Sequence, residues 1–243
     1  MKAIILAGGK GKRLQVISDL LPKPLMPING IPILSSTLNS LKQSGIVDVA
    51  IVTGHHGDLI RRFAGDGGDY GVSITYYEQV ELMGSGHAVL QAIGFVDEPV
   101  MVIAGDTAFS SAHLEGLSEF HREMSSDVSL CLKRLPTERL ASTSSVQLGD
   151  DHRILSFVEK PQPGKAPSNL SAALLHIYPA NLGDYLNKVS ISVRGEYELT
   201  EVINMMIADG LRVMGKEFPL PPDITDARDF LRLNFPYMSE LVN

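Results

Sequence analysis

Residues 1–32 read MKAIILAGGKGKRLQVISDLLPKPLMPINGIP, and this stretch decides the fold. It begins with a wholly apolar run at residues 3–7, the pattern of a strand that is buried on both faces. The run GGKGKR at residues 8–13 follows directly. Glycines let backbone N–H groups approach oxygen atoms closely, and Lys and Arg side chains neutralise negative charge. The strand and the turn together therefore predict a site for a polyphosphate.

Two familiar phosphate-binding motifs do not fit this turn. The P-loop requires a second glycine five residues after the first, and the residue in that position after Gly8 is Arg13. The dinucleotide fingerprint begins correctly with Gly9 and Gly11, but its third glycine position is occupied by Leu14. The turn therefore belongs to a different kind of phosphate site.

The segment PKPLMPI at residues 22–28 adds a second feature. Prolines on both sides of Lys23 stiffen the backbone, which predicts that this lysine points at a fixed target. Together with LAGGKGKRL at residues 6–14, the segment resembles the signature of the sugar-1-phosphate nucleotidylyltransferases, although Lys12 stands where that family usually has Thr. The alternative interpretation is a Gly-rich turn followed by a Pro-rich surface loop. It accounts for either segment alone better than for the two segments together.

The composition sets limits on the class of protein. The chain has 243 residues, of which 44% are hydrophobic and 20% charged, ordinary proportions for a soluble globular protein with one substantial core. A net charge of −7 argues against a surface for nucleic acid or acidic membranes. Cys131 is the sole cysteine, which excludes an intramolecular disulfide and fits a reducing cytoplasm. No apolar run approaches the ~20 residues of a membrane-spanning helix, and we expect no signal peptide.

Apolar runs alternate with helical patterns along the first half of the chain. We expect strands at residues 3–7, 47–53, 72–77, 99–104 and 128–133, and helices at 33–44, 58–64, 86–94 and 112–125. This alternation predicts an α/β fold with an open, mainly parallel, Rossmann-like mixed sheet flanked by helices. Ligands of such sheets bind beyond the carboxyl ends of the strands, so we expect one crevice to collect Lys10, Arg13, Gln79 and Asp106.

The resemblance implies a GT-A-like nucleotidyltransferase fold. Residues 1–243 would form a single nucleotidyltransferase domain, with a nucleotide-binding half at 1–110 and a sugar-phosphate-binding half at 111–243. Many relatives carry a C-terminal β-helix domain, which we expect to be absent because the resemblance ends only a few residues before the chain does.

The resemblance also implies which residues bind the nucleotide. The Gly-rich turn would hold the triphosphate through Leu6, Ala7, Gly8, Gly9, Gly11 and Arg13. Arg13 and Lys23 would be the catalytic residues. Gln79 and Gly84 would bind the base, and Ser85 is a further nucleotide-binding residue. A glutamine side chain, with both a donor and an acceptor, suits the imide edge of uracil or thymine. UTP or dTTP is therefore the expected nucleotide.

Two aspartates match the family's metal ligands. Asp106 follows a buried strand directly, and Asp223 takes the second position by spacing, with Asp226 as the alternative. Mg²⁺ is typically held by one or two carboxylates together with substrate phosphates, so Mg²⁺ is the expected cofactor. Without the rest of the signature, a lone aspartate after a strand is more often a turn residue or a helix cap.

The second half of the chain matches the family's sugar-phosphate side in part. Lys160 lies in a Glu-Lys-Pro motif and would pair with the phosphate of the acceptor. Glu159, Glu196 and Gly105 would contact the rest of the acceptor. Thr200 is expected to be the N-cap of the helix that follows Glu196.

Two departures from the family pattern fall on the acceptor pocket. The family's Tyr-Gly-Val triplet is replaced by SSV at residues 144–146, and its Asn-x-Gly run by AAL at 172–174. Ser145, Ala172 and Leu174 therefore change the shape and polarity expected for this pocket. Glucose 1-phosphate or N-acetylglucosamine 1-phosphate is the default acceptor, and a less polar phosphorylated alcohol or a cyclitol is the alternative.

The expected activity is the condensation of an NTP with a sugar 1-phosphate to an NDP-sugar and pyrophosphate. We expect a cytoplasmic enzyme without nucleic-acid or membrane partners, and a homo-oligomer is compatible with the sequence. A regulatory subunit that binds nucleotide sugar with weak catalysis is an alternative of a different class. The altered acceptor pocket favours that alternative, whereas the presence of Arg13, Lys23, Asp106 and Lys160 argues against it.

Overall fold

A seven-stranded sheet forms the centre of the protein in a computed structural model that describes residues 1–11, 14–219, 224 and 226–235. The strand order is β11-β7-β10-β6-β1-β4-β5. Every neighbouring pair is parallel except the two pairs that contain β10. The strands are β1 (Lys2–Ala7), β4 (Asp48–Thr53), β5 (Ser73–Glu78), β6 (Val100–Ala104), β7 (Val128–Arg134), β10 (Leu170–Tyr178) and β11 (Val213–Glu217). The predicted open, mainly parallel α/β sheet is confirmed.

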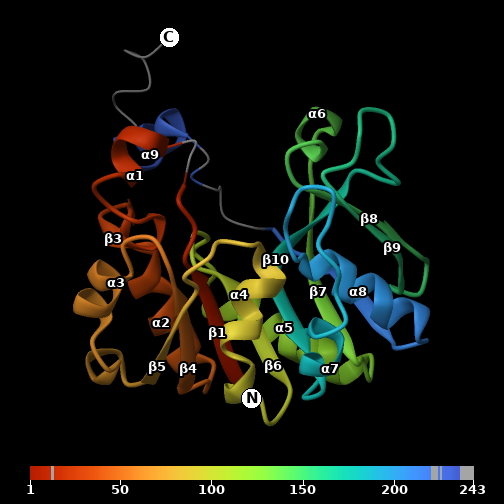
Figure 1. The fold of residues 1–243 in the computed structure, drawn as a ribbon, viewed down its shortest axis with the longest axis horizontal. Coiled ribbons are helices and arrows are strands. Elements are labelled where there is room, and N and C mark those ends of the chain that lie inside the picture. Colours follow the sequence, from red (N-terminus) through yellow and green to blue (C-terminus); the bar gives the residue numbers. More distant parts are fainter. Residues whose placement is uncertain (12–13, 220–223, 225, 236–243) are drawn as a thin grey trace.

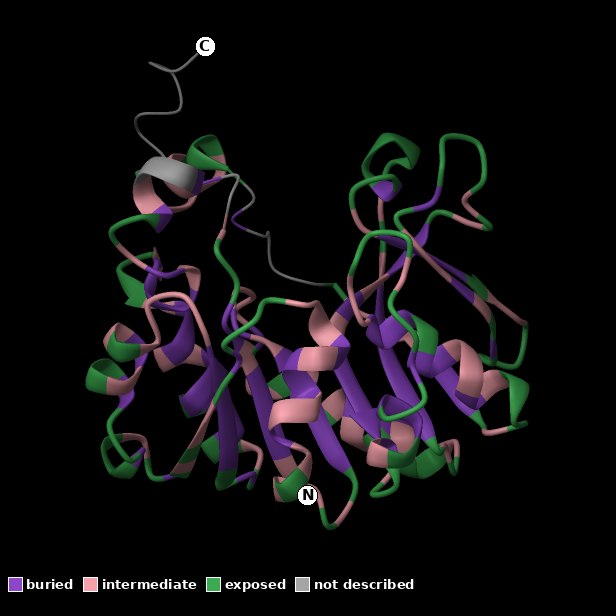
Figure 2. Ribbon diagram, viewed as in Figure 1, coloured by how far each residue is buried: buried purple, intermediate pink, exposed green. Residues whose placement is uncertain are grey.

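Helices cover both faces of this sheet (Figure 1). One layer contains α4 (Ser85–Gln91), α7 (Leu182–Leu186) and α8 (Leu199–Ala208), and the other contains α2 (Ile33–Gln43), α3 (Gly57–Ala64) and α5 (Ser111–Glu123). Successive side chains of a strand point to opposite faces, so Ile4 of β1 joins the first core whereas Ala3 and Ile5 join the second. Both layers exclude water, and Figure 2 shows the strands as mostly buried.

Smaller elements stand beyond the carboxyl edge of the sheet. Figure 1 places α1 (Gln15–Ser18) and α9 (Ala227–Asn234) at one end of this edge, and α6 (Thr137–Leu140) with the hairpin of β8 (Ser144–Leu148) and β9 (Ile154–Glu159) at the other. The remaining short elements are η2 (Lys23–Leu25), β2 (Pro27–Ile28), β3 (Ile31–Pro32), η3 (Gly68–Tyr70) and η4 (Ile93–Phe95). Across the described part of the chain, no helix has the length and apolar content to cross a membrane.

The predicted helix boundaries differ from the observed ones by up to three residues, and one predicted helix cap is wrong. The helix predicted over residues 86–94 begins at Ser85 and ends at Gln91, and the short η4 follows it. The predicted cap at Thr200 is also wrong, because Glu198 occupies the N-cap position of α8. Thr200 lies in the first turn, where its hydroxyl donates to Oε2 of Glu159 at 2.9 Å. The Thr200 hydroxyl, which the local sequence predicted to cap the helix, therefore bonds instead to a residue of the distant strand β9.

Strand β10 carries an irregularity next to the functional site. Its pairing with β7 shifts register between Ala173 and His176, so Leu174 and Leu175 lie in a bulge on that side. On its other side, Leu175 pairs with Ile103 of β6. Bulges change the direction in which nearby side chains point, and they are common next to active sites.

The single cysteine lies in the core. Cys131 of β7 is fully buried and forms no disulfide. Burial in this apolar environment raises the pKa of its thiol to about 12. A thiol that stays protonated at neutral pH is chemically inert, so Cys131 is a packing residue.

Candidate active site

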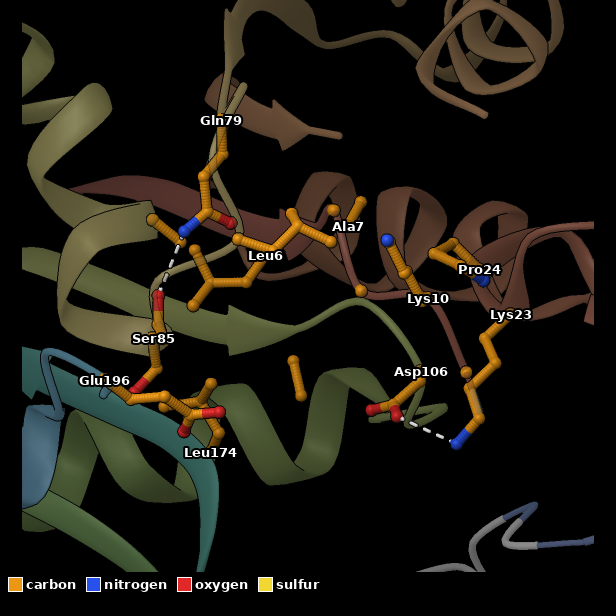
Figure 3. A pocket seen from close by; sticks show the side chains of 17 residues that line it. Leu6, Ala7, Lys10, Lys23, Pro24, Gln79, Ser85, Asp106, Leu174 and Glu196 are labelled. Atoms are coloured by element: carbon orange, nitrogen blue, oxygen red, sulfur yellow. Dashed lines mark hydrogen bonds and ion pairs between the residues drawn. The ribbon is translucent and has the colours of Figure 1, made fainter. Parts of the chain in front are cut away.

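A cavity of about 660 Å³ lies at the carboxyl ends of β1 and β6 (Figure 3). Its walls come from segments that are far apart in the sequence: residues 6–11, the start of η2, Gln79, the turn before α4, the last residue of β6 with Asp106, Leu174 of β10, and Glu196. The position agrees with the expected crevice at the edge of the sheet.

The cavity brings together the predicted residues of the nucleotide side. Its described lining includes Leu6, Ala7, Gly8, Gly9, Gly11, Lys23, Gln79, Gly84, Ser85 and Asp106, together with Glu196 from the predicted acceptor side. The described lining does not include Gly105, Glu159 or Lys160. Arg13 and Asp223 lie outside the described residues, so their predicted roles stay predictions.

Lys23 and Asp106 form an ion pair in the cavity wall. Nζ of Lys23 lies 3.3 Å from Oδ2 of Asp106 (Figure 3). Lys23 is the first residue of η2, and the extended Pro22 before it directs the backbone. The Lys23 side chain is 20% exposed and that of Asp106 is 45% exposed. A pair this open to water contributes about 0–1 kcal/mol to stability, so a charged ligand can replace either partner.

The end of the cavity that is predicted to bind the base is built on a close backbone approach. Gln79 is buried just beyond β5, and its Nε2 donates to the carbonyl oxygen of Gly84 at 3.0 Å. Gly84 has a φ of +98°, and a Cβ at this position would lie 2.6 Å from the carbonyl oxygen of Tyr197. Only glycine fits this position, because both the backbone angle and the space exclude a side chain.

Glu159 and Lys160 are neighbours in the sequence, but the Glu159 carboxyl is largely buried whereas Lys160 is exposed. Burial raises the pKa of the Glu159 carboxyl, and the hydrogen bond from Thr200 acts in the opposite direction. Lys160 is exposed, has a φ of +43°, and donates its backbone N–H to the carbonyl oxygen of Thr143 at 2.6 Å. The lysine of the predicted phosphate contact is therefore a solvated side chain in this structure.

Three other predicted residues have contacts that stabilise the fold. The N–H of Gly105 donates to the carbonyl oxygen of Leu6 at 2.9 Å, and a Cβ on Gly105 would lie 2.7 Å from that same oxygen. Ser145 is fully buried, and its hydroxyl donates to the carbonyl oxygen of Ser168 at 2.8 Å. Oδ1 of Asp226 accepts two backbone N–H groups in the first turn of α9, so this aspartate is a helix cap.

Further residues line the cavity. Lys10, which was expected in the crevice, does so together with the rest of the Gly-rich turn. Leu82 and Ala88 also line it, but apolar residues of this kind cannot be distinguished from core residues by type. A smaller hollow of about 280 Å³ adjoins the cavity, and Ala172 lines it together with Leu174.

An edge-of-sheet cavity with a Gly-rich turn is typical of α/β proteins that bind nucleotides. Within that class, the chain belongs to the nucleotidyl transferase family, whose model matches residues 2–232. It is 32% identical over 211 residues to a glucose-1-phosphate thymidylyltransferase of Streptomyces griseus, covering 86% of this chain and 58% of that protein. It is 30% identical over 211 residues to the UTP–glucose-1-phosphate uridylyltransferase AglF of Haloferax volcanii, covering 86% and 85%.

A further relative agrees with the family, and two solved structures share the fold. The low-salt glycan biosynthesis nucleotidyltransferase Agl11 of Haloferax volcanii is 29% identical over 240 residues, with 95% of this chain matching 66% of that protein. A putative glucose-1-phosphate thymidylyltransferase from Bacillus anthracis, solved in complex with sucrose, aligns with a TM-score of 0.83 at 28% identity, covering 100% and 96% of the chains. A UDP-glucose pyrophosphorylase complexed with UDP-glucose shares the fold, with a TM-score of 0.85 at 19% identity and coverage of 98% of both chains.

Proposed function

We propose that this protein transfers a nucleotidyl group from a nucleoside triphosphate to a sugar 1-phosphate or a related phosphorylated alcohol. The observation that carries the proposal is the single cavity that gathers the Gly-rich turn, Lys23, Asp106, Gln79 and Glu196. Family membership and the names of the relatives support the same reaction.

The reaction needs no nucleophile from the protein, because the phosphate of the acceptor is already an anion. One of its oxygens attacks the α-phosphorus of the NTP. A new phosphorus–oxygen bond forms, the bond from the α-phosphorus to the bridging oxygen breaks, and pyrophosphate leaves. The protein contributes position and charge neutralisation. Lys23 stabilises the negative charge that develops at the α-phosphate, the backbone N–H groups of residues 8–11 hold the triphosphate, and Arg13 adds a second cation.

The residues of the cavity fit Mg²⁺ as the cofactor. Asp106 presents a carboxylate that is 45% exposed beside Lys23, an arrangement open to a hydrated cation. The described residues contain no group of three or more His, Cys, Asp or Glu side chains suited to a metal ion. Mg²⁺ does not require such a group, because substrate phosphates and water complete its shell. We assign Asp106 and Asp223 as its ligands, and the bound ion would neutralise and orient the triphosphate.

The two ends of the cavity suggest the two substrates. Gln79 and Gly84 at the base end support UTP or dTTP as the nucleotide. Glu196 offers an acceptor for a hydroxyl group of the second substrate, whereas Leu174 presents an apolar surface. Glucose 1-phosphate or N-acetylglucosamine 1-phosphate is the default acceptor, a phosphorylated alcohol or cyclitol with an apolar face is the alternative, and Lys160 is the proposed partner of its phosphate.

A pyrophosphate-release assay tests the proposal. UTP, dTTP, CTP, GTP and ATP are each combined with glucose 1-phosphate, N-acetylglucosamine 1-phosphate or inositol 1-phosphate, with Mg²⁺ and with EDTA. We expect pyrophosphate and a matching nucleotide product in at least one combination, no release without an acceptor, and no release with EDTA. Tight binding of a nucleotide sugar without turnover in any combination would instead support the regulatory role.

A further inference from the structure

The smaller hollow of about 280 Å³ beside the cavity has no role in the reaction proposed above. The two spaces share the wall residues Lys23, Ala104, Asp106 and Leu174. Beyond this common wall, the hollow is lined by residues from the end of β7, from α6 and from the segment before β8: Lys133, Leu135, Arg139, Ser142 and Thr143. Because a water molecule occupies about 30 Å³ in the liquid, the hollow has room for a carboxylate or a phosphate group together with some of its water.

Basic side chains dominate the described lining of the hollow. It contains the cations Lys23, Lys133 and Arg139 and the single carboxylate of Asp106, whose Oδ2 lies 3.3 Å from Nζ of Lys23. Among the described residues, the guanidinium of Arg139 has no hydrogen-bond or ion-pair partner. The whole chain has a net charge of −7, so this concentration of basic groups runs against the overall balance. Such a wall attracts an anion, and a guanidinium binds a carboxylate or a phosphate through two parallel hydrogen bonds.

Strand β7 supplies one basic side chain to the hollow and a second one to the surface beside it. Successive side chains of a strand point to opposite sides, so Lys133 and Arg134 diverge. Lys133 lines the hollow, whereas Nε of Arg134 donates to Oε2 of Glu217 at 3.1 Å. Arg134 is therefore a matched control for the charges of the hollow.

Two observations associate the hollow with the acceptor rather than with the nucleotide. Its described lining includes none of residues 8–11, the proposed site of the triphosphate. The carbonyl oxygen of Thr143, a lining residue, accepts the backbone N–H of Lys160 at 2.6 Å, so the proposed partner of the acceptor phosphate is joined to this wall. Leu174 lines both spaces, and an acceptor that packs on it can therefore extend from the cavity into the hollow.

We infer that the hollow binds a second acidic group of the acceptor, a carboxylate or a phosphate that is distinct from the phosphate that reacts. The inference rests on the proposed function, in which the acceptor phosphate attacks the α-phosphorus beside Lys23. Arg139 and Lys133 hold the second acidic group and take no part in bond making. The acceptor is then a phosphorylated sugar acid or a sugar bisphosphate rather than a neutral sugar 1-phosphate.

Three acceptors that differ at a single carbon test this inference. Glucuronic acid 1-phosphate carries a carboxylate where glucose 1-phosphate carries a hydroxymethyl group, and glucose 1,6-bisphosphate carries a second phosphate there. The readout is the dissociation constant of each compound, measured by titration calorimetry with Mg²⁺, with and without α,β-methylene UTP. We expect the parent protein to bind one of the two acidic compounds about tenfold more tightly than glucose 1-phosphate, the scale of one hydrogen bond to a charged group. The absence of such a preference for either acidic compound would overturn the inference.

Variants of the lining then locate the acidic group. Arg139→Gln and Lys133→Gln each remove one positive charge from the hollow, and we expect either to lower the preference for the acidic compound by about tenfold without changing the affinity for glucose 1-phosphate. Arg134→Gln removes the same charge outside the described lining and should leave the preference unchanged. Weaker binding of all three compounds alike in Arg139→Gln would assign the hollow to the reacting phosphate, and weaker binding of the UTP analogue alone would assign it to the nucleotide. Either result, or an unchanged preference in Arg139→Gln, would overturn the inference.

The inference and the proposed function can fail separately. The dissociation constants are measured without turnover, and the preference of the parent protein does not depend on any variant. Absence of pyrophosphate release with every NTP contradicts the proposed function, whereas absence of a preference for an acidic compound contradicts the role of the hollow.

Discussion

The two ends of the cavity are built in different ways. The nucleotide end depends on backbone: Gly84 meets the carbonyl of Tyr197, and residues 8–11 turn directly after β1. The proposed acceptor end depends on side chains that are remote in the sequence, with Leu174 in the bulge of β10 and Glu196 before α8. A site formed by closely packed backbone tolerates few substitutions, whereas substitutions in a site formed by side chains can change which ligand it binds. Two departures from the family pattern, at residues 144–146 and 172–174, accordingly fall on the acceptor side.

The largest effect that this comparison predicts is at Lys23. Lys23→Ala removes the cation that pairs with Asp106 in the cavity wall, and we expect turnover to fall by about 100-fold or more, the scale of one electrostatic stabiliser. The measurement is pyrophosphate release at saturating substrates. Near-parental turnover of purified Lys23→Ala would contradict the mechanism.

Lys160→Ala is the matched comparison for Lys23→Ala. It removes the same charge from an exposed side chain outside the described cavity lining, where water weakens electrostatic interactions. We expect about a tenfold rise in KM for the sugar phosphate, the scale of one hydrogen bond to a charged group, and no change in KM for the NTP. A loss of turnover as large as that of Lys23→Ala would show that Lys160 moves into the cavity when substrates bind.

An intermediate effect is expected at the acceptor end. Leu174→Ala removes apolar bulk from the cavity wall, and we expect the ratio of kcat/KM for N-acetylglucosamine 1-phosphate over glucose 1-phosphate to rise by about tenfold. The ratio is independent of any loss of folded protein. Leu155→Ala, at a leucine of β9 that is 49% exposed, is the control and should leave the ratio unchanged. An unchanged ratio in Leu174→Ala would place the acceptor elsewhere in the cavity.

The smallest effect concerns the stability of the acceptor side. Because burial raises the pKa of Glu159, the folded protein holds this proton more tightly than the unfolded chain does. The resulting stabilisation is complete below the ordinary pKa of a glutamate and is lost as the pH rises through the raised pKa. Glu159→Gln keeps an acceptor for Thr200 without the charge. We therefore expect its Tm to exceed that of the parent by about 2–4 °C at pH 8 and to approach it at pH 4.

An exposed glutamate of α8 supplies the control for this stability measurement. Glu201→Gln should shift the Tm by the same amount at pH 4 and at pH 8. A Tm difference between Glu159→Gln and the parent that does not depend on pH would show that the carboxyl of Glu159 is not destabilised by burial.

Local motifs predicted much of the fold and of the nucleotide end of the site. The apolar run of β1 and the glycines after it made residues 6–11 recognisable, and the prolines around Lys23 indicated a directed side chain. The role of Thr200 could not be predicted in this way, since its hydroxyl bonds to Glu159, which is distant in the sequence. The contact of Gln79 with His87 could not be predicted for the same reason, because the two residues belong to different elements. The solvated position of Lys160 also depends on the packing of β9 rather than on its motif.

The amino-acid sequence by itself determined the parallel core, the Gly-rich turn and the family, because buried strands and tight turns restrict residue types over short stretches. Tertiary structure alone decided that the bulge of β10 lies at the cavity with Leu174 in its wall, and that His87 meets Gln79. Strand register and side-chain orientation arise from contacts between segments far apart in the chain, and no local pattern encodes those contacts.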